Sequence, residues 1–247
     1  MGRREAERAA LLEAPDRRAY LLAGSHLPGP RANLELLDAA GDVLTRDEAL
    51  GLAALTPAEA PSGTALEFLP CCGLVAVGRL VADGDASLVG LLRTAANDER
   101  WRVREGVAIA LQRWGDAAVA TMIAAIEPWT GGTLLEARAA VAAICEPRLL
   151  RSRASAAAAV RVLDAATTAL VGIPRPRGEP GRVLGAALGY GWSVAVAADP
   201  EAALPTFERW VGSDDVDVRR LVRENLSKAR FARAAPEAVA ALRSRLG

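Results

Sequence analysis

A short motif recurs along this chain of 247 residues. Each copy places an arginine among apolar residues spaced three or four positions apart, as in Val103–Leu111, Ala137–Cys145 and Val218–Leu226. The marker arginines are Arg104, Arg138, a degenerate copy at Arg182, and Arg219, which gives steps of 34, 44 and 37 residues. Periods of this size predict stacked pairs of helices, because one pair cannot bury its apolar face alone. The repeat therefore predicts an architecture with an extended surface, but it does not indicate a ligand or a catalysed reaction.

The composition favours helices throughout. Hydrophobic residues make up 51% of the chain but aromatic residues only 4%, so Ala, Leu and Val must fill the core. Ala and Leu favour helix, and no long stretch alternates apolar and polar residues as a half-buried strand does. We predict an all-α fold, an α-α superhelix of about five to six helix pairs.

Helix pairs are clearest after residue 86. An outer helix is expected at Ser87–Ala96 and an inner helix at Trp101–Trp114, which Gly115 and Asp116 end. Later pairs are expected at 117–127 with 134–145, 152–171 with 182–198, and 201–211 with 216–228. We predict one repeat domain over residues 1–247, with divergent helices at 1–86, recognisable repeats at 87–231 and a capping helix at 232–247.

Three local signals make further structural predictions. Thr45 and Glu48 have the spacing of a capping box at a helix start. Pro70 interrupts an apolar segment at 65–81 that is still long enough for a buried helix. The segment Gly172–Gly181 is rich in proline and glycine, so we expect a long loop that projects from the fold and exposes the charges of Arg175 and Arg177.

The turn before the inner helix carries a family resemblance. Residues 97–104, Asn-Asp-Glu-Arg-Trp-Arg-Val-Arg, followed by an apolar helix and Gly115-Asp116, resemble the HEAT repeat, and residues 213–219 look like a second copy. The resemblance implies stacked helix pairs and a scaffold or adaptor function. It also implies that Arg104 and Arg219 bond to acids and carbonyls near their turns, with Asp98 and Asp214 available. The alternative is a row of arginines lining an anion-binding groove.

Charge is balanced overall and uneven locally. With 30 basic and 30 acidic residues, the formal net charge is zero, which argues against a protein whose main task is to bind nucleic acid. Between Asp38 and Glu99 there are ten acidic residues and three arginines, whereas Val216–Gly247 has eight basic residues and three acidic ones. The basic end either attracts polyanions or is a solvated helix face.

The sequence contains no pattern typical of catalysis. Its three cysteines form no CxxC pair, and His26 is the only histidine, so a multi-histidine metal site is excluded. The glycines at 181, 185 and 189 are spaced for close helix packing rather than for phosphate binding. We predict no catalytic residue, metal or cofactor. The cysteine usage, the charged N-terminus and an apolar run at 183–198 too short for a span predict a cytoplasmic protein without a membrane partner.

Two functions remain open. The leading prediction is a non-enzymatic scaffold that binds a protein or peptide, with contacts at Trp101, Arg102, Glu105, Arg220 and Arg223. Trp101 and Trp129 stand outside the predicted apolar helix faces, unlike Trp114 and Trp210. The alternative is a DNA-binding or base-excision enzyme resembling the HEAT-like DNA alkylation-repair glycosylases, with Trp210, Asp214 and Arg219 at its site. No residue-by-residue match to a catalytic set supports that alternative.

Overall fold

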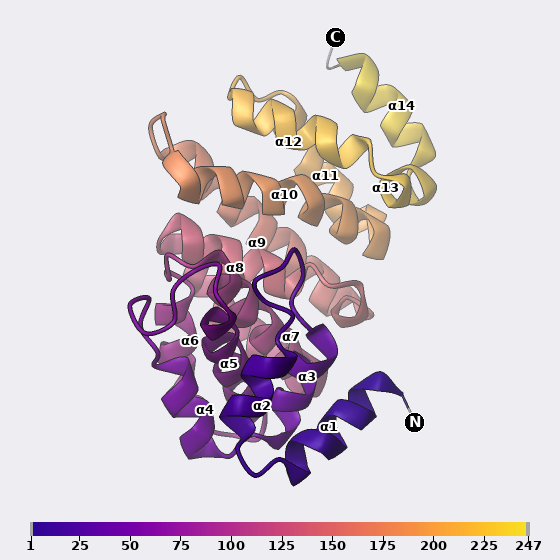
Figure 1. The fold of residues 1–247 in the computed structure, drawn as a ribbon. Helices are drawn as coiled ribbons and strands as arrows, with labels where there is room; N and C mark the ends of the chain where they lie inside the picture. Colours follow the sequence, from indigo (N-terminus) through magenta and orange to yellow (C-terminus); the bar gives the residue numbers. More distant parts are fainter. Residues whose placement is uncertain (1, 246–247) are drawn as a thin grey trace. The chain divides into compact units, whose positions relative to one another are not determined.

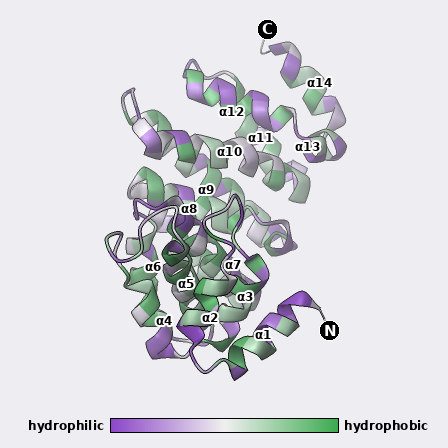
Figure 2. Cartoon of the chain, in the orientation of Figure 1, coloured by the Kyte–Doolittle hydropathy of each residue, from purple (hydrophilic) through white to green (hydrophobic). Residues whose placement is uncertain are grey.

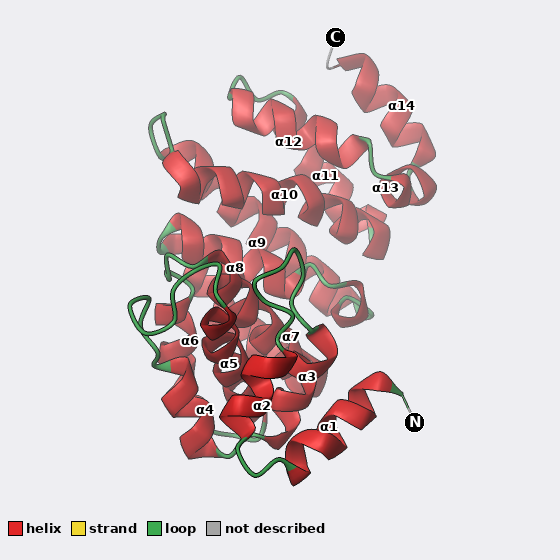
Figure 3. Cartoon of the chain, in the orientation of Figure 1, coloured by secondary structure: helices red, strands yellow, loops and turns green. Residues whose placement is uncertain are grey.

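The computed structural model of the chain describes residues 2–245, and these residues form helices joined by turns and loops (Figure 3). No strand occurs within this range, so the all-α prediction is confirmed. The chain divides into two compact units, Met1–Ala117 and Ala118–Gly247. We describe each unit separately, and one repeat domain over the whole chain stays a prediction.

The first unit contains six complete α-helices and the start of a seventh. They are α1 (Arg3–Glu13), α2 (Arg17–Gly24), α3 (Leu34–Val43), α4 (Arg46–Ala53), α5 (Phe68–Ala82), α6 (Val89–Ala95) and α7 (Trp101–Ile126), with short 3-10 helices η1 (Ala65–Glu67) and η2 (Ala86–Leu88). The predicted capping box opens α4, because Glu48 accepts from the Thr45 backbone while the Thr45 hydroxyl accepts from Glu48 N.

Helix α5 is the centre of the first unit. It packs against α3 and α4, and nearly all of its residues are buried, which agrees with its hydrophobic colouring in Figure 2. Gly73 lies against the backbone of α4 at Ala53, and Gly78 lies against the backbone of α7 at Ala110. Glycine permits these two close approaches because it lacks a Cβ atom.

The buried helix predicted at 65–81 is confirmed, and Pro70 does not interrupt it. Pro70 lies in the first turn of α5, where its missing N–H leaves no intrahelical bond unmade, so the helix begins before it. Gly115 and Asp116 do not end the inner helix either. The break comes at Ala118, whose φ of −150° and ψ of 70° are not helical. One helical glycine costs only about 1 kcal/mol, which the packing of α7 offsets.

The second unit begins at Ala118 and contains the rest of the helices. They are α8 (Leu134–Ile144), α9 (Arg153–Gly172), α10 (Gly178–Ala198), α11 (Pro200–Val211), α12 (Val216–Leu226), α13 (Ala229–Ala234) and α14 (Pro236–Arg245), with η3 (Glu127–Gly131) and η4 (Pro147–Leu149). Helix α10 packs against both α8 and α12, while α9 packs against α11 (Figure 1). Most helices after residue 86 begin and end close to the predicted positions. The predicted cap at 232–247 becomes α14, and residues 246–247 lie outside the described range.

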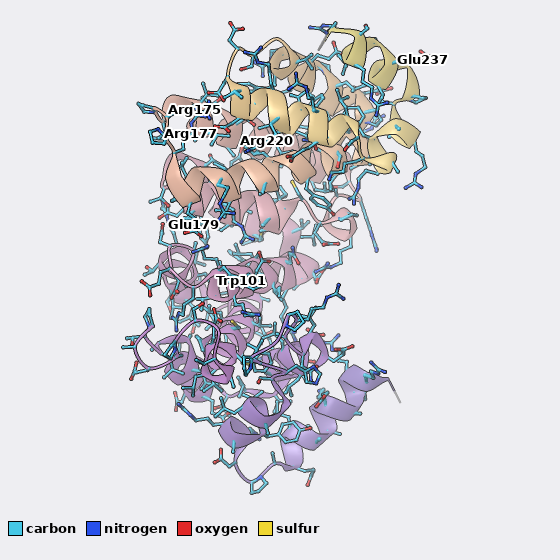
Figure 4. All side chains as sticks on the ribbon, turned by 45° about the horizontal axis from the view of Figure 1, so that its top comes forward. Trp101, Arg175, Arg177, Glu179, Arg220 and Glu237 are labelled. Carbon is cyan, nitrogen blue, oxygen red and sulfur yellow. The ribbon has the colours of Figure 1, made fainter. Side chains whose placement is uncertain are left out.

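The loop between α9 and α10 differs from its prediction. Only residues 173–177 are outside a helix, because Gly178, Pro180 and Gly181 form the first turn of α10. A proline is tolerated there for the reason given for Pro70. Arg177 is not exposed: 5% of its side chain is accessible, and its guanidinium binds the carboxylates of Asp215 and Asp217 at 2.5 Å each. Arg175 does remain exposed (Figure 4).

Two helical stretches match a membrane span in length and composition. They are Ala65–Ala82 and Arg153–Gly172, and 72% and 56% of their respective windows are buried inside the fold. Burial of this extent is also found in core helices of proteins without a membrane span.

Candidate functional site

A groove of about 610 Å³ opens on the first unit between α3, α5, the start of α7 and the loop that precedes α3. Three residues predicted to contact a partner, Trp101, Arg102 and Glu105, all line it. Its other lining residues are Pro30, Arg31, Ala32, Leu34, Glu35, Leu37, Phe68, Cys71, Gly106 and Ile109. The structure therefore brings these three predicted residues together in one concave site, which we call the Trp101 groove.

The Trp101 groove has an apolar surface that remains partly open to solvent. Phe68 and Leu37 are buried beneath it, whereas Trp101 is 50% exposed and Leu34 is 61% exposed. Large apolar side chains gathered at a concave surface are typical of ligand or partner sites. Neither Leu34 nor Phe68 stood out in the sequence, because each occupies an ordinary apolar position of a helix.

Arg102 fixes one wall of the groove. Its guanidinium carbon lies 4.4 Å from the centre of the Trp101 ring, a cation–π distance. Its Nη1 lies 3.3 Å from Oε2 of Glu67, and its Nη2 donates to the carbonyl oxygen of Gly29 at 2.9 Å. Glu67 is fully buried and also accepts from Ser62 Oγ and Gly63 N. These contacts hold the loop before α3 against α7 and orient the indole ring before any partner binds.

Arg100 lies beside the groove in sequence but has a structural role. It is buried, its Nη2 donates to Asp98 Oδ2 at 2.7 Å, and its other donors reach the carbonyl oxygens of Leu55, Thr56 and Ala60. The hydrogen bond with Asp98 raises the pKa of Arg100, so its positive charge is permanent. All of these contacts are to other residues of the fold, so Arg100 has no donor directed at the groove. The adjacent Trp101 and Arg102 are the residues that face it.

The thiol that lines the groove is unreactive. Burial, together with the nearby carboxylate of Glu67, raises the pKa of Cys71 to about 12. A nucleophilic cysteine needs a lowered pKa, so Cys71 contributes packing. Burial also raises the pKa of Cys145 to about 12 and that of Cys72 well above its ordinary value. No metal-binding group of His, Cys, Asp and Glu side chains forms within residues 2–245. His26 is exposed and is not among the groove residues.

The other two predicted contacts belong to the second unit. Arg220 and Arg223 lie on the exposed side of α12, and Arg220 is about half exposed. The ion pairs of Arg220 are long, 3.5 Å to Asp217 and 3.8 Å to Glu224. Three of the five predicted contacts therefore belong to the first unit and two belong to the second.

Two of the repeat arginines bond to backbone carbonyl oxygens of the turns that precede their own helices. Arg104 is buried and donates to the carbonyl oxygens of Asp98 and Glu99 at 2.7 and 3.0 Å. Arg219 donates to the carbonyl oxygen of Asp214 at 2.7 Å. Each arginine closes the turn before its own helix.

The residues named for a DNA site have contacts within the fold. The indole Nε1 of Trp210 donates to Oδ1 of Asp164 on α9 at 2.9 Å, while Arg219 is tied to its own turn. Trp129, one of the two tryptophans predicted outside the core, is buried. Trp101 is the tryptophan that this chain exposes most. No family model matches the sequence, and no curated protein matches it.

Proposed function

We propose that this protein is a non-enzymatic scaffold that binds a peptide segment of a partner protein in the Trp101 groove. One observation carries the proposal: the half-exposed Trp101 ring lies over a concave apolar surface and is oriented by Arg102. Aromatic side chains held rigid beside a pocket are the commonest anchors of protein interfaces. The buried Cys71 offers no competing chemistry in the groove.

The charges around the groove indicate the kind of peptide that fits. Arg102 is neutralised by Glu67, and the other charged lining residues are Arg31, Glu35 and Glu105. The first unit as a whole has 13 basic and 17 acidic residues, a net charge of −4. We therefore infer a segment with one bulky apolar side chain on the Trp101 surface and a basic residue beside it.

The packing of helices in the second unit supports a scaffold built from HEAT-like helix pairs. In the second unit α8, α10 and α12 follow one another as neighbours, and α9 neighbours α11, which is the packing expected for stacked helix pairs. The turn-closing arginines Arg104 and Arg219 add to this support. Because the thiols are buried and unpaired, we place the scaffold in the reducing cytoplasm.

A peptide-display selection on the whole chain, followed by calorimetry, tests the proposal. Selected peptides are expected to combine an aromatic or aliphatic anchor with a basic residue. Trp101→Ala should weaken their binding by about 2 kcal/mol, since a central aromatic anchor is removed. Leu12→Ala is the matched control, because Leu12 is an exposed apolar residue on α1 outside the groove. Unchanged affinity in Trp101→Ala would exclude the groove as the binding site.

A further inference from the structure

One repeat arginine lacks the structural contacts of the others. Arg104 and Arg219 bind carbonyl oxygens of the turns that precede their helices. Arg182 occupies the corresponding position near the start of α10, yet it is exposed and forms no hydrogen bond or ion pair with any residue in the range 2–245. Its side chain is available for an external ligand.

A second guanidinium, that of Arg220, lies against α10 one turn after Arg182. Arg220 reaches from α12 across α10: a Cβ atom at Gly185 would lie 3.2 Å from its Nη2. Gly185 follows Arg182 by three residues, so the two positions lie on adjacent turns of α10, and the Arg220 guanidinium lies one turn from the exposed Arg182. Figure 4 labels Arg220 at this surface. The glycine gives the guanidinium room to lie over the helix.

The donors of Arg220 are largely unused. Its contacts to Asp217 and Glu224 measure 3.5 and 3.8 Å, and no hydrogen bond joins its guanidinium to another part of the described chain. A guanidinium carries five N–H donors in a planar fork that matches a carboxylate or phosphate. The two acids restrain Arg220 without occupying those donors. Arg223, one turn further along α12, is exposed beside it.

The charge around the three arginines favours a small anion over a polyanion. The second unit has 17 basic and 13 acidic residues, a net charge of +4, which attracts anionic partners. Asp217 and Glu224, however, lie directly beside Arg220 and would repel a continuous row of phosphates. A single anionic group can reach the guanidinium groups and avoid those acids.

We infer that Arg182, Arg220 and Arg223 form a site for one anionic side chain of a partner peptide, a glutamate carboxylate or a phosphorylated serine. These arginines belong to the second unit and the Trp101 groove belongs to the first, so the inference rests on the proposed protein-binding function and adds a second site to it. The planar fork of Arg220 makes the main contact, and the exposed Arg182 and Arg223 supply additional positive charge.

Fluorescence anisotropy on the whole chain tests the inference with three peptides of about 12 residues, a length suited to a helix surface. They share one sequence and differ at a central phosphoserine, glutamate or serine. We expect the phosphoserine or glutamate peptide to bind more tightly than the serine peptide, and the order of the two identifies the anion. Equal, weak binding of all three peptides overturns the inference.

Variants locate the site. Arg182→Gln and Arg220→Gln should each weaken binding of the anionic peptide about tenfold, as loss of a charge-assisted hydrogen bond does. Arg220→Lys should not restore it, because lysine keeps the charge and loses the fork. Arg233→Gln is the matched control: it removes one exposed positive charge on α13, outside the surface. An equal loss in Arg233→Gln would assign the binding to general charge, against the inference.

Two further measurements distinguish this site from a nucleic-acid surface and from the Trp101 groove. Duplex DNA of about 20 base pairs that binds more tightly than every peptide, with a steep fall between about 50 and 200 mM salt, would replace the peptide with nucleic acid. Trp101→Ala should leave binding of the anionic peptide unchanged, so that failure of the groove and failure of this site give different results. Circular dichroism confirms that each variant folds.

Discussion

The side-chain amide of Asn225 joins α12 to α10 at Ser193. Its Oδ1 accepts from the backbone N–H of Ser193 at 2.7 Å, and its Nδ2 donates to the carbonyl oxygens of Leu188 at 2.9 Å and Leu221 at 2.7 Å. Asn225 is fully buried. One polar side chain thus pairs backbone groups of both helices away from water, which fixes how these helices pack.

Replacing that amide should destabilise the protein. Asn225→Leu has a similar volume but leaves Ser193 N–H and the Leu188 carbonyl without the side chain that they bind, so we expect a loss of about 3 kcal/mol in the free energy of unfolding. Urea unfolding followed by circular dichroism measures it. Ser227→Ala, an exposed change on the same helix end, should shift stability by less than about 0.5 kcal/mol. If Asn225→Leu lowers the free energy of unfolding by less than about 0.5 kcal/mol, water replaces the hydrogen bonds of the amide and the prediction is wrong.

A glycine on α5 allows a second close helix contact. A Cβ atom at Gly78 would lie 2.4 Å from the backbone oxygen of Ala110, so Gly78→Ala must push α5 and α7 apart. We expect a loss of about 2 kcal/mol, typical of overpacking. Gly51→Ala on α4 meets no atom within 4 Å and should stabilise by about 0.5–1 kcal/mol through helix propensity. Thermal unfolding of both variants tests this difference. A change in stability of the same direction in both variants would contradict the prediction.

The helical architecture was predictable because it rests on periodic signals. The copies around Arg104 and Arg219 placed their turns and inner helices, and the capping box at Thr45 placed the start of α4. These signals act within one or two turns of helix, so they can be read from a single sequence. Gly115 misled for the same local reason, since packing on neighbouring helices decides whether a glycine ends a helix.

The candidate site was predictable only in part. Trp101, Arg102 and Glu105 stood out because an aromatic residue among charges is unusual at a helix start. Leu34 and Phe68 come from elsewhere in the chain and meet Trp101 only through the packing of α3 and α5 on α7. The buried partner of Arg177 was hidden for the same reason, because Asp215 lies 38 residues away in sequence.

Arg102 should control the loop before α3. Arg102→Met removes the donor to Gly29 and leaves buried Glu67 without its ion-pair partner, so we expect a loss of about 2–3 kcal/mol in stability. Hydrogen exchange should also become faster at the amides of Leu27 and Asn33, which are bonded inside this loop. Arg18→Met, at an exposed arginine of α2, is the control. The double variant Arg102→Met/Glu67→Gln should recover part of the lost stability, because the buried charge is then removed. No recovery would show that Arg102 and Glu67 are not energetically coupled.

Acid should weaken the start of α12. The hydrogen bond from Arg177 and bonds from the backbone N–H groups of Asp217 and Val218 lower the pKa of Asp215. A lowered pKa in the folded state gives stability that is complete above the ordinary pKa and is lost as pH falls through the folded value. Unfolding free energy should therefore decrease below about pH 4, and Asp215→Asn should flatten that decrease. If the free energy of unfolding falls with pH equally steeply in Asp215→Asn, Asp215 does not contribute to the loss of stability in acid.

Limited trypsin digestion tests the corrected loop between α9 and α10. Trypsin does not cut before proline, so the Arg175–Pro176 bond is resistant and the bond after Arg177 is the site that the sequence alone would favour. Because Arg177 is buried in ion pairs with Asp215 and Asp217, we expect the native protein to resist cleavage there. Asp217→Asn weakens that cluster and should expose the bond, since proteolysis needs a locally opened chain. Asp199→Asn, which removes a carboxylate at the start of α11, is the control. Rapid cleavage after Arg177 in the unmodified protein would contradict the buried arginine and restore the projecting loop.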